Sequence, residues 1–167
     1  MNNELRKSLS KLATALNRNH VQCMLVGGVA VGFYGYERQS IIKDLGRPEL
    51  VHDIDFWYNP TITNFTNLVK AMKALGVDTE SLDDYVFDPD KTFLRIPFET
   101  FRAEFLPKMP GLESFPECFR RAKQITFDGN EIAIIGYDDL ILSKKTLNRE
   151  IDRQDIEQLQ KRNPKST

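Results

Sequence analysis

The sequence has 167 residues, of which 41% are hydrophobic and 28% are charged, and its formal net charge is −1 at pH 7. This is typical of one globular domain with a sizeable core, and the near-neutral charge argues against broad electrostatic binding to nucleic acid or to an anionic membrane. Two cysteines, Cys23 and Cys118, are too few for a disulfide framework, and two histidines disfavour a zinc site of the Cys/His type. The first residues lack the apolar core of a signal peptide, and no apolar run is long enough to cross a bilayer. We therefore expect a cytoplasmic protein without a membrane partner.

In the first half of the chain, the spacing of hydrophobic residues predicts helices and strands separated by polar segments. Leucines spaced three to four residues apart predict a first helix over residues 3–18. The elements that follow are a buried strand over 21–26 that ends at Gly27-Gly28, a short helix over 29–35, a polar loop or lid over 37–49, a strand over 50–58, and a helix from Thr61 or Thr63 to Gly76.

The second half begins with an acidic loop over 78–91. Two strands over 92–96 and 101–106 form a predicted antiparallel hairpin, and they are followed by a proline-punctuated loop over 107–116 and a short helix over 117–122. An Asp-Gly-Asn turn then joins strands over 124–127 and 131–135, and two helices over 137–147 and 151–161 follow. We expect a single domain over 1–162, with its helical C-terminal part at about 137–162 and a polar tail over 163–167.

Two aspartates lie one residue apart in the apolar strand pattern over 50–58. Because side chains alternate faces along a strand, Asp53 and Asp55 project from one face while Ile54 and Phe56 take the other. Two like charges side by side repel each other, so a compensating positive charge is expected. Mg²⁺ prefers oxygen ligands and often bridges carboxylates to phosphates, which makes metal binding one interpretation. Simple solvation, or pairing with Lys or Arg, is the other.

Two further features each allow two interpretations. The pair Gly27-Gly28 follows a strand, where glycine permits close backbone approach to a phosphate and the next helix adds N–H donors, but it is equally a tight turn. Glu104 is displayed from a strand on the same face as Arg102. Its carboxylate either joins the aspartates or forms a surface pair with Arg102 or a nearby lysine.

Together these features resemble the nucleotidyltransferase fold superfamily of DNA polymerase β, and most closely its small bacterial members related to the nucleotidyltransferase toxins. The resemblance runs from about residue 21 to residue 159 and implies an α+β fold: a nucleotidyltransferase-like mixed β-sheet flanked by helices, with a short C-terminal helical segment. The matching tracts are Leu25-Val26-Gly27-Gly28-Val29-Ala30, His52-Asp53-Ile54-Asp55-Phe56-Trp57, Ala103-Glu104-Phe105-Leu106, and a helical tract over 139–155.

The resemblance also implies roles for individual residues. Asp53, Asp55 and Glu104 would bind Mg²⁺, with Mn²⁺ as a possible substitute, and Glu104 would either bind metal or deprotonate the acceptor. Gly27 and Gly28 would bind the nucleotide.

This chain departs from the family pattern in two places. The third acidic position is more usually aspartate, and the extra methylene of Glu104 moves its carboxylate outward. In related small proteins an Arg and a Ser or Thr often precede the aspartates, and here Arg38 and Ser40, across a longer connection, are candidates to supply those groups. Alternatively, Arg38 and the other basic residues of this connection are only solvated side chains on one face of a loop.

The helical end carries another basic candidate. The resemblance implies that Lys144 reaches the triphosphate as a point charge. Asp152 and Asp155 share a helical face, and we interpret them as a structural salt-bridge cluster with Arg149 and Arg153.

The implied reaction transfers a nucleoside monophosphate from an NTP to a hydroxyl acceptor, which is a small molecule, a protein side chain or an RNA end such as that of tRNA. A cognate antitoxin is a further implied partner. Two alternatives remain open. One is a degenerate member that binds nucleotide or a partner protein without catalysis, which the glutamate at position 104 and the altered approach to Asp53 favour. The other is a metal-dependent phosphohydrolase.

Overall fold

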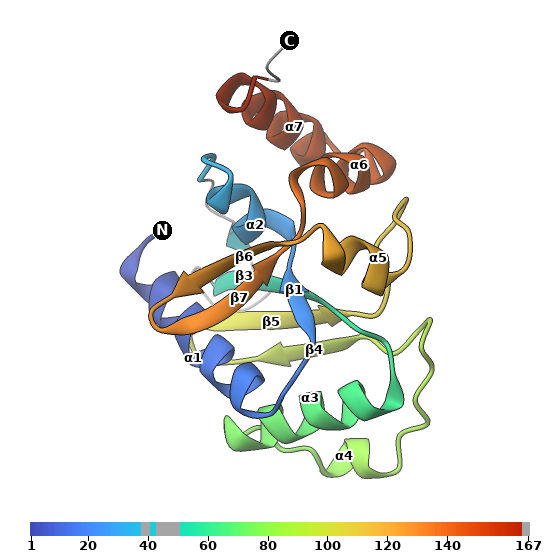
Figure 1. Ribbon diagram of the computed structural model, residues 1–167. Helices are drawn as coiled ribbons and strands as arrows, with labels where there is room; N and C mark the ends of the chain where they lie inside the picture. Colours follow the sequence, from blue (N-terminus) through green and yellow to red (C-terminus); the bar gives the residue numbers. More distant parts are fainter. Residues whose placement is uncertain (38–40, 43–50, 165–167) are drawn as a thin grey trace.

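The computed structural model describes residues 1–37, 41–42 and 51–164 (Figure 1). The helices are α1 (Asn3–Arg18), α2 (Gly27–Phe33), α3 (Ile62–Ala74), α4 (Glu80–Asp83), α5 (Phe115–Arg120), α6 (Tyr137–Leu147) and α7 (Glu150–Arg162). The strands are β1 (Cys23–Leu25), β2 (Ile41–Ile42), β3 (Val51–Tyr58), β4 (Leu94–Pro97), β5 (Phe101–Leu106), β6 (Lys123–Phe127) and β7 (Asn130–Ile134).

The strands form one mixed sheet in the order β4-β5-β3-β1-β7-β6, and β2 pairs with β3 beside this path. β3 runs parallel to β5 and antiparallel to β1, and β1 runs parallel to β7. The predicted hairpins β4–β5 and β6–β7 are both present, and they supply the two ends of the sheet. The arrangement confirms the predicted α+β class with a mixed sheet.

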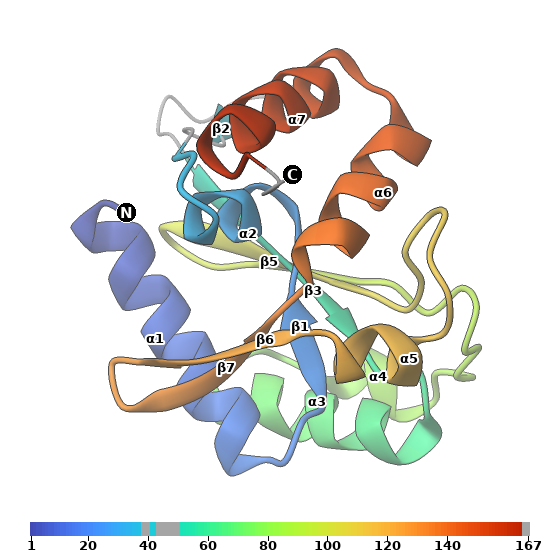
Figure 2. The same cartoon turned by 45° about the horizontal axis from the view of Figure 1, so that its top comes forward.

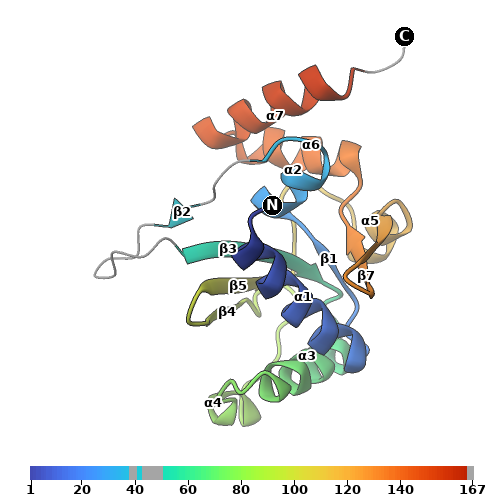
Figure 3. The same cartoon turned by 90° about the vertical axis from the view of Figure 1, so that its left-hand side faces the viewer.

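Helices lie on both sides of the sheet. α1 packs beside α3, and α6 and α7 lie beyond α2 on the other side of the sheet from α3 and α4 (Figures 1 and 3). The view in Figure 2 shows α7 passing over α2. Of the described helices, none is both long and apolar enough to cross a membrane.

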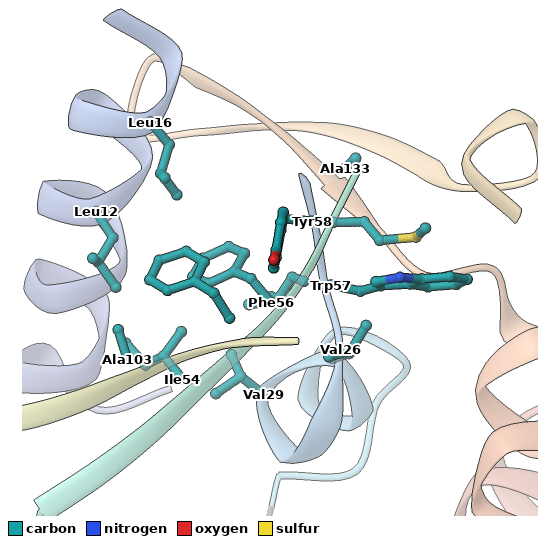
Figure 4. Packing of buried hydrophobic residues seen from close by; sticks show 14 of the residues in the cluster. Leu12, Leu16, Val26, Val29, Ile54, Phe56, Trp57, Tyr58, Ala103 and Ala133 are labelled. Carbon is teal, nitrogen blue, oxygen red and sulfur yellow. The ribbon is translucent and has the colours of Figure 1, made fainter. Parts of the chain in front are cut away.

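The main core lies between α1 and the sheet face opposite the aspartates. Ile54 and Phe56 of β3 point toward Leu12 of α1 (Figure 4), and all three side chains are at most 2% exposed. The ring of Phe56 stacks on that of Phe105, with centroids 5.4 Å apart. On the aspartate face of β3, Trp57 is also buried, and its indole N–H donates to the backbone carbonyl of Pro107 over 3.1 Å. Both faces of β3 therefore hold it rigidly.

The structure differs from the predicted elements in four places. The predicted loop over 37–49 contains the short strand β2, and residues 38–40 and 43–50 lie outside the described part of the chain. The acidic loop contains the single turn of α4, and α5 begins at Phe115 rather than at residue 117, because proline is well suited to the first helical turn. α2 begins at Gly27 rather than at Val29. The two residues of β2 are β-branched and favour a strand, but so short a run forms one only through its pairing with β3.

The start of α2 depends on a glycine at position 27. Gly27 has a φ of +65°, which is costly for residues with a Cβ, and a Cβ built there would lie 2.9 Å from Cγ of Asp55 and would overlap its carboxylate. The backbone N–H of Val26 donates to the carbonyl of Asp55 over 2.9 Å. Glycine thus lets α2 begin directly against β3.

The pair α6 and α7 is joined by buried charges. Lys144 of α6 is buried, and its Nζ lies 2.7 Å from Oδ2 of Asp155 and 3.4 Å from Oδ1 of Asp152, both fully buried on α7. Burial alone would raise the pKa of the Asp152 carboxyl, but hydrogen bonds from Arg149 and the charge of Lys144 hold it below its ordinary value. The salt-bridge interpretation of the two aspartates is confirmed, with Lys144 and Arg149 as their partners. Arg153 instead donates to the carbonyl of Asn148 over 2.7 Å.

We predict that Gly27→Ala lowers the free energy of unfolding by more than about 2 kcal/mol, because backbone strain adds to overlap with Asp55. Gly32, in the same helix, has room for a Cβ, whose nearest neighbour would be Cγ of Glu37 at 3.7 Å. Gly32→Ala should therefore stabilise the protein by about 0.5–1 kcal/mol. Chemical denaturation of both variants measures the contrast, and equal effects would contradict the role given to Gly27.

We also predict that Lys144→Met destabilises the protein by roughly 3 kcal/mol, because it leaves buried carboxylates without a countercharge. Lys145 is exposed on the same helix, so Lys145→Met should change stability by less than about 0.5 kcal/mol. Thermal and urea unfolding of the two variants provide the measurement. A stable Lys144→Met protein would show that the buried pairs do not hold α6 to α7.

Candidate active site

The pairing of β3 with β5 brings three carboxylates together. In this parallel register Asp55 stands opposite Glu104, and Asp53 stands opposite Arg102, so all four side chains share one face of the sheet. Asp53, Asp55 and Glu104 are partly buried, and each offers a carboxylate oxygen within 4.8 Å of the other two. The extra methylene of Glu104 therefore does not carry its carboxylate out of reach of the aspartates.

Two arginines neutralise part of this charge. Arg102 donates from Nε and Nη2 to the two carboxylate oxygens of Asp53, over 3.2 and 3.1 Å. Its Nη2 also lies 3.1 Å from Oε1 of Glu104, to which Nε of Arg95, from β4, donates over 2.7 Å. The predicted pairing of Glu104 with Arg102 thus coexists with its approach to the aspartates.

The surroundings of Arg102 favour its charged form. Partial burial opposes it, but the hydrogen bond and charge of Asp53, together with the charges of Glu104 and Asp55, raise the pKa of the guanidinium above its ordinary value. Three carboxylates and two guanidinium groups leave this cluster with a formal charge of −1. The compensating positive charge expected beside the aspartates is therefore supplied here by arginine.

The carboxylate oxygens also fit a divalent cation. Mg²⁺ binds oxygen at about 2.1 Å, so oxygens on opposite sides of the ion lie about 4.2 Å apart, and small side-chain rotations suffice to bring these oxygens into range. Both carboxylate groups, those of Asp53 and Glu104, also contact the guanidinium of Arg102. A cation at this position would have to displace that guanidinium at least in part.

The glycine turn lies directly beside this cluster. Gly27 approaches the Asp55 carboxylate so closely that no side chain fits between them, and the first turn of α2 follows. The structure thus places two of the three sequence motifs in contact at Asp55. Both Gly27 and Gly28 belong to α2, and their contact with a nucleotide stays a prediction.

The remaining predicted site residues are Arg38, Ser40 and Lys144. Arg38 and Ser40 lie outside the described residues. Lys144, expected at the triphosphate, is buried, and its ammonium is held by Asp152 and Asp155 instead. The ammonium of Lys144 is thus engaged between the two helices, and its contact with a triphosphate stays a prediction.

Arginine 95 is the residue of the cluster that sequence reasoning missed. Its approach to Glu104 follows from the antiparallel register of β4 and β5, in which the two residues are direct partners. The hairpin was predicted, but its register was not. A count from the predicted turn over 97–100 would have placed Arg95 opposite Arg102, whereas the observed turn is centred on Glu99 and Thr100 and places Arg95 opposite Glu104.

Comparison with known proteins agrees with this geometry. The family model of nucleotidyl transferases of unknown function (DUF2204) matches residues 5–167. TM1012 from Thermotoga maritima, a protein inferred to be a nucleotidyltransferase, superposes with a TM-score of 0.58 at 13% identity, over 95% of this chain and 93% of its own.

Two further solved structures are similar as well. The lincomycin-bound lincosamide antibiotic adenylyltransferase LnuA gives a TM-score of 0.58 at 14% identity, over 92% of this chain and 95% of its own. The solution structure of the antibiotic-resistance factor ANT(2'')-Ia gives 0.59 at 13% identity, over 96% of this chain and 85% of its own. At such identities the likeness concerns the fold. The chain has the nucleotidyltransferase fold and belongs to the DUF2204 family of nucleotidyl transferases.

Proposed function

We propose that this protein transfers a nucleoside monophosphate from an NTP to a hydroxyl acceptor, with Mg²⁺ or Mn²⁺ bound by Asp53, Asp55 and Glu104. The observation that carries the proposal is the convergence of three carboxylate oxygens within 4.8 Å of one another on one face of the sheet. Membership of a nucleotidyl transferase family supports the reaction class. The carboxylate cluster supports the metal, because hard divalent cations prefer such ligands.

Each carboxylate has its own role in this proposal. Asp53 and Asp55 would bind the metal beside the α-phosphate. Glu104, the strand partner of Asp55, would lie beside the acceptor hydroxyl. The bound metal would lower the pKa of that hydroxyl and offset the charge of the leaving group. A bond forms between the acceptor oxygen and the α-phosphorus, the bond to pyrophosphate breaks, and the acceptor proton passes to Glu104 or to solvent.

The acceptor is a separate question. One structurally similar protein is a lincosamide antibiotic adenylyltransferase in a lincomycin-bound structure, and another is an antibiotic-resistance factor. This similarity of fold makes a hydroxyl-bearing small molecule the first acceptor to test, ahead of a protein side chain or a tRNA end. A cytoplasmic location and a cognate antitoxin stay predictions.

One observation favours the non-catalytic alternative. Arg102 and Arg95 form ion pairs with Asp53 and Glu104, two of the carboxylates that would bind the metal. Ion pairs of this kind would also be expected in a protein that has lost its metal. Such a protein would bind nucleotide or a partner without transferring anything. The two functions differ in whether a cation can displace Arg102.

We predict that Asp53→Asn and Asp55→Asn each lower nucleotidyl transfer by at least about a hundredfold, because each removes a negative metal ligand. The assay uses the four α-labelled NTPs with Mg²⁺ or Mn²⁺ and three acceptor pools: lincosamide and aminoglycoside antibiotics, total tRNA, and protein extract. Asp84→Asn is the matched control, because Asp84 is the exposed C-cap residue of α4, and α4 lies on the other side of the sheet from α2 and α7 (Figure 3).

The outcomes of this assay separate the candidate functions. Label that reaches an acceptor with wild type and Asp84→Asn, but not with the other two variants, supports the proposed reaction. Free labelled monophosphate without a labelled acceptor would indicate a phosphohydrolase. NTP binding without transfer to any pool would favour the non-catalytic alternative, and equal transfer by all variants would rule out this site.

We also predict that Arg102→Gln tightens Mn²⁺ binding by at least about fivefold, because it removes a cation that competes for Asp53 and Glu104. Arg6→Gln is the control, since Arg6 pairs with Asp128 away from this cluster. Mn²⁺ titration followed by calorimetry or electron paramagnetic resonance provides the affinity without any need for turnover. Unchanged or weaker Mn²⁺ binding in Arg102→Gln would show that arginine and metal do not compete.

A further inference from the structure

Arg149 is an exposed arginine held in a fixed position. It is the N-cap residue of α7, and its side chain is 62% exposed. Nevertheless its Nε donates to Oδ2 of Asp152 over 2.7 Å, its Nη2 donates to Oδ1 over 3.1 Å, and its backbone N–H donates to Oδ2 over 3.1 Å. Most exposed arginines lose side-chain entropy when they bind a ligand, whereas a guanidinium already fixed by a bidentate pair loses less.

The carboxylate that fixes Arg149 is itself fixed from below. Asp152 is fully buried, and its Oδ1 lies 3.4 Å from Nζ of Lys144, which also contacts Asp155. Lys144 and Asp152 therefore form a rigid base for one exposed cation. Of the residues that the structure describes, none accepts a hydrogen bond from Nη1 of Arg149, so one edge of its guanidinium faces solvent with its donors available.

This cation lies on the side of the sheet that carries the metal carboxylates. The end of α6 packs against the loop that follows β5, since a Cβ at Gly111 would overlap the side chain of Thr146. The end of α7 packs on α2, where Nδ2 of Asn163 donates to the carbonyl of Tyr34 over 3.0 Å. α6 is thus held against the segment that follows Glu104, and α7 passes over α2, the helix that begins at Gly27 beside Asp55 (Figure 2).

Electrostatics agrees with this placement. The hydrogen bond and charge of Asp152 are the main reasons that the pKa of Arg149 is raised, and the charge of Asp55 raises it further. Interactions between charges at a protein surface fade over about one Debye length, roughly 8–10 Å in physiological salt. The charge of Asp55 thus acts on the guanidinium of Arg149 in the same direction as that of Asp152, which agrees with a position of Arg149 on the carboxylate side of the sheet.

We propose that Arg149 binds the β- or γ-phosphate of the NTP, and that Asp152 and Lys144 are positioning residues that hold its guanidinium toward the leaving group. This inference rests on the proposed function and adds a residue to it. A guanidinium has five N–H donors, and those not engaged by Asp152 suit phosphate oxygens. In this proposal Arg149 takes the role at the triphosphate that the sequence suggested for Lys144, and Lys144 acts indirectly by holding Asp152.

The test is NTP, NDP and NMP binding measured by calorimetry in Mg²⁺ without an acceptor. We expect Arg149→Ala to weaken NTP binding by about tenfold to a hundredfold and NMP binding by less than about twofold, because the NMP lacks the phosphates that Arg149 would contact. Arg149→Lys should recover part of the NTP affinity. Arg153→Ala is the matched control, because Arg153 belongs to the same helix but is engaged at Asn148.

Two further measurements separate binding from folding. Asp152→Asn keeps the side-chain shape but removes the charge that holds Arg149, so it should weaken NTP binding more than NMP binding while Mn²⁺ affinity stays unchanged. A general folding defect would instead weaken all three together, which thermal unfolding would reveal, and this result would overturn the proposal. Equal NTP affinity of Arg149→Ala and Arg153→Ala would overturn it as well. If the wild-type protein binds no NTP, the proposed function fails together with the role of Arg149. If the wild type binds NTP but Arg149→Ala binds it equally well, only the role of Arg149 fails.

Discussion

The parallel pairing of β3 with β5 is the constraint on which the candidate site depends. Asp55 and Glu104 are 49 positions apart in the chain, yet the register places them side by side, and the alternation of side chains then puts Asp53 and Arg102 on the same face. Strand register is discrete, since a slip by one residue would turn every side chain to the opposite face. Because Ile54 and Phe56 must be buried beneath α1, the hydrophobic core fixes the register and the carboxylates follow from it.

A second constraint ties the nucleotide motif to the metal motif. Gly27 lies against the Asp55 carboxylate, in a conformation that glycine alone adopts without strain. The glycine motif and the aspartate motif, which both indicated function in the sequence, therefore meet in one packing contact between Gly27 and Asp55. The interpretation of Gly27-Gly28 as a tight turn and its interpretation as a phosphate motif do not exclude each other, because the turn is what brings the backbone to the carboxylates.

The positions of arginines and lysines determine how the charge of each carboxylate is balanced. Arg95 and Arg102 balance part of the charge of the carboxylates, while Lys144 lies beneath the surface and balances Asp152 and Asp155. Buried ion pairs of this kind add little net stability, but removing one partner is costly, so they are effective at fixing orientation. In this protein they fix the direction of Arg149, the exposed cation of the C-terminal helices.

The sequence by itself determined the α+β class, most element positions, and the strand face of Asp53 and Asp55, because hydrophobic periodicity is a local property. It also indicated Glu104 as the third carboxylate through the resemblance. Only the tertiary structure decided that Glu104 reaches the aspartates despite its extra methylene, that Arg95 joins them, and that Lys144 faces inward. These outcomes depend on strand register and on helix packing between distant segments, and no local pattern of residues encodes them.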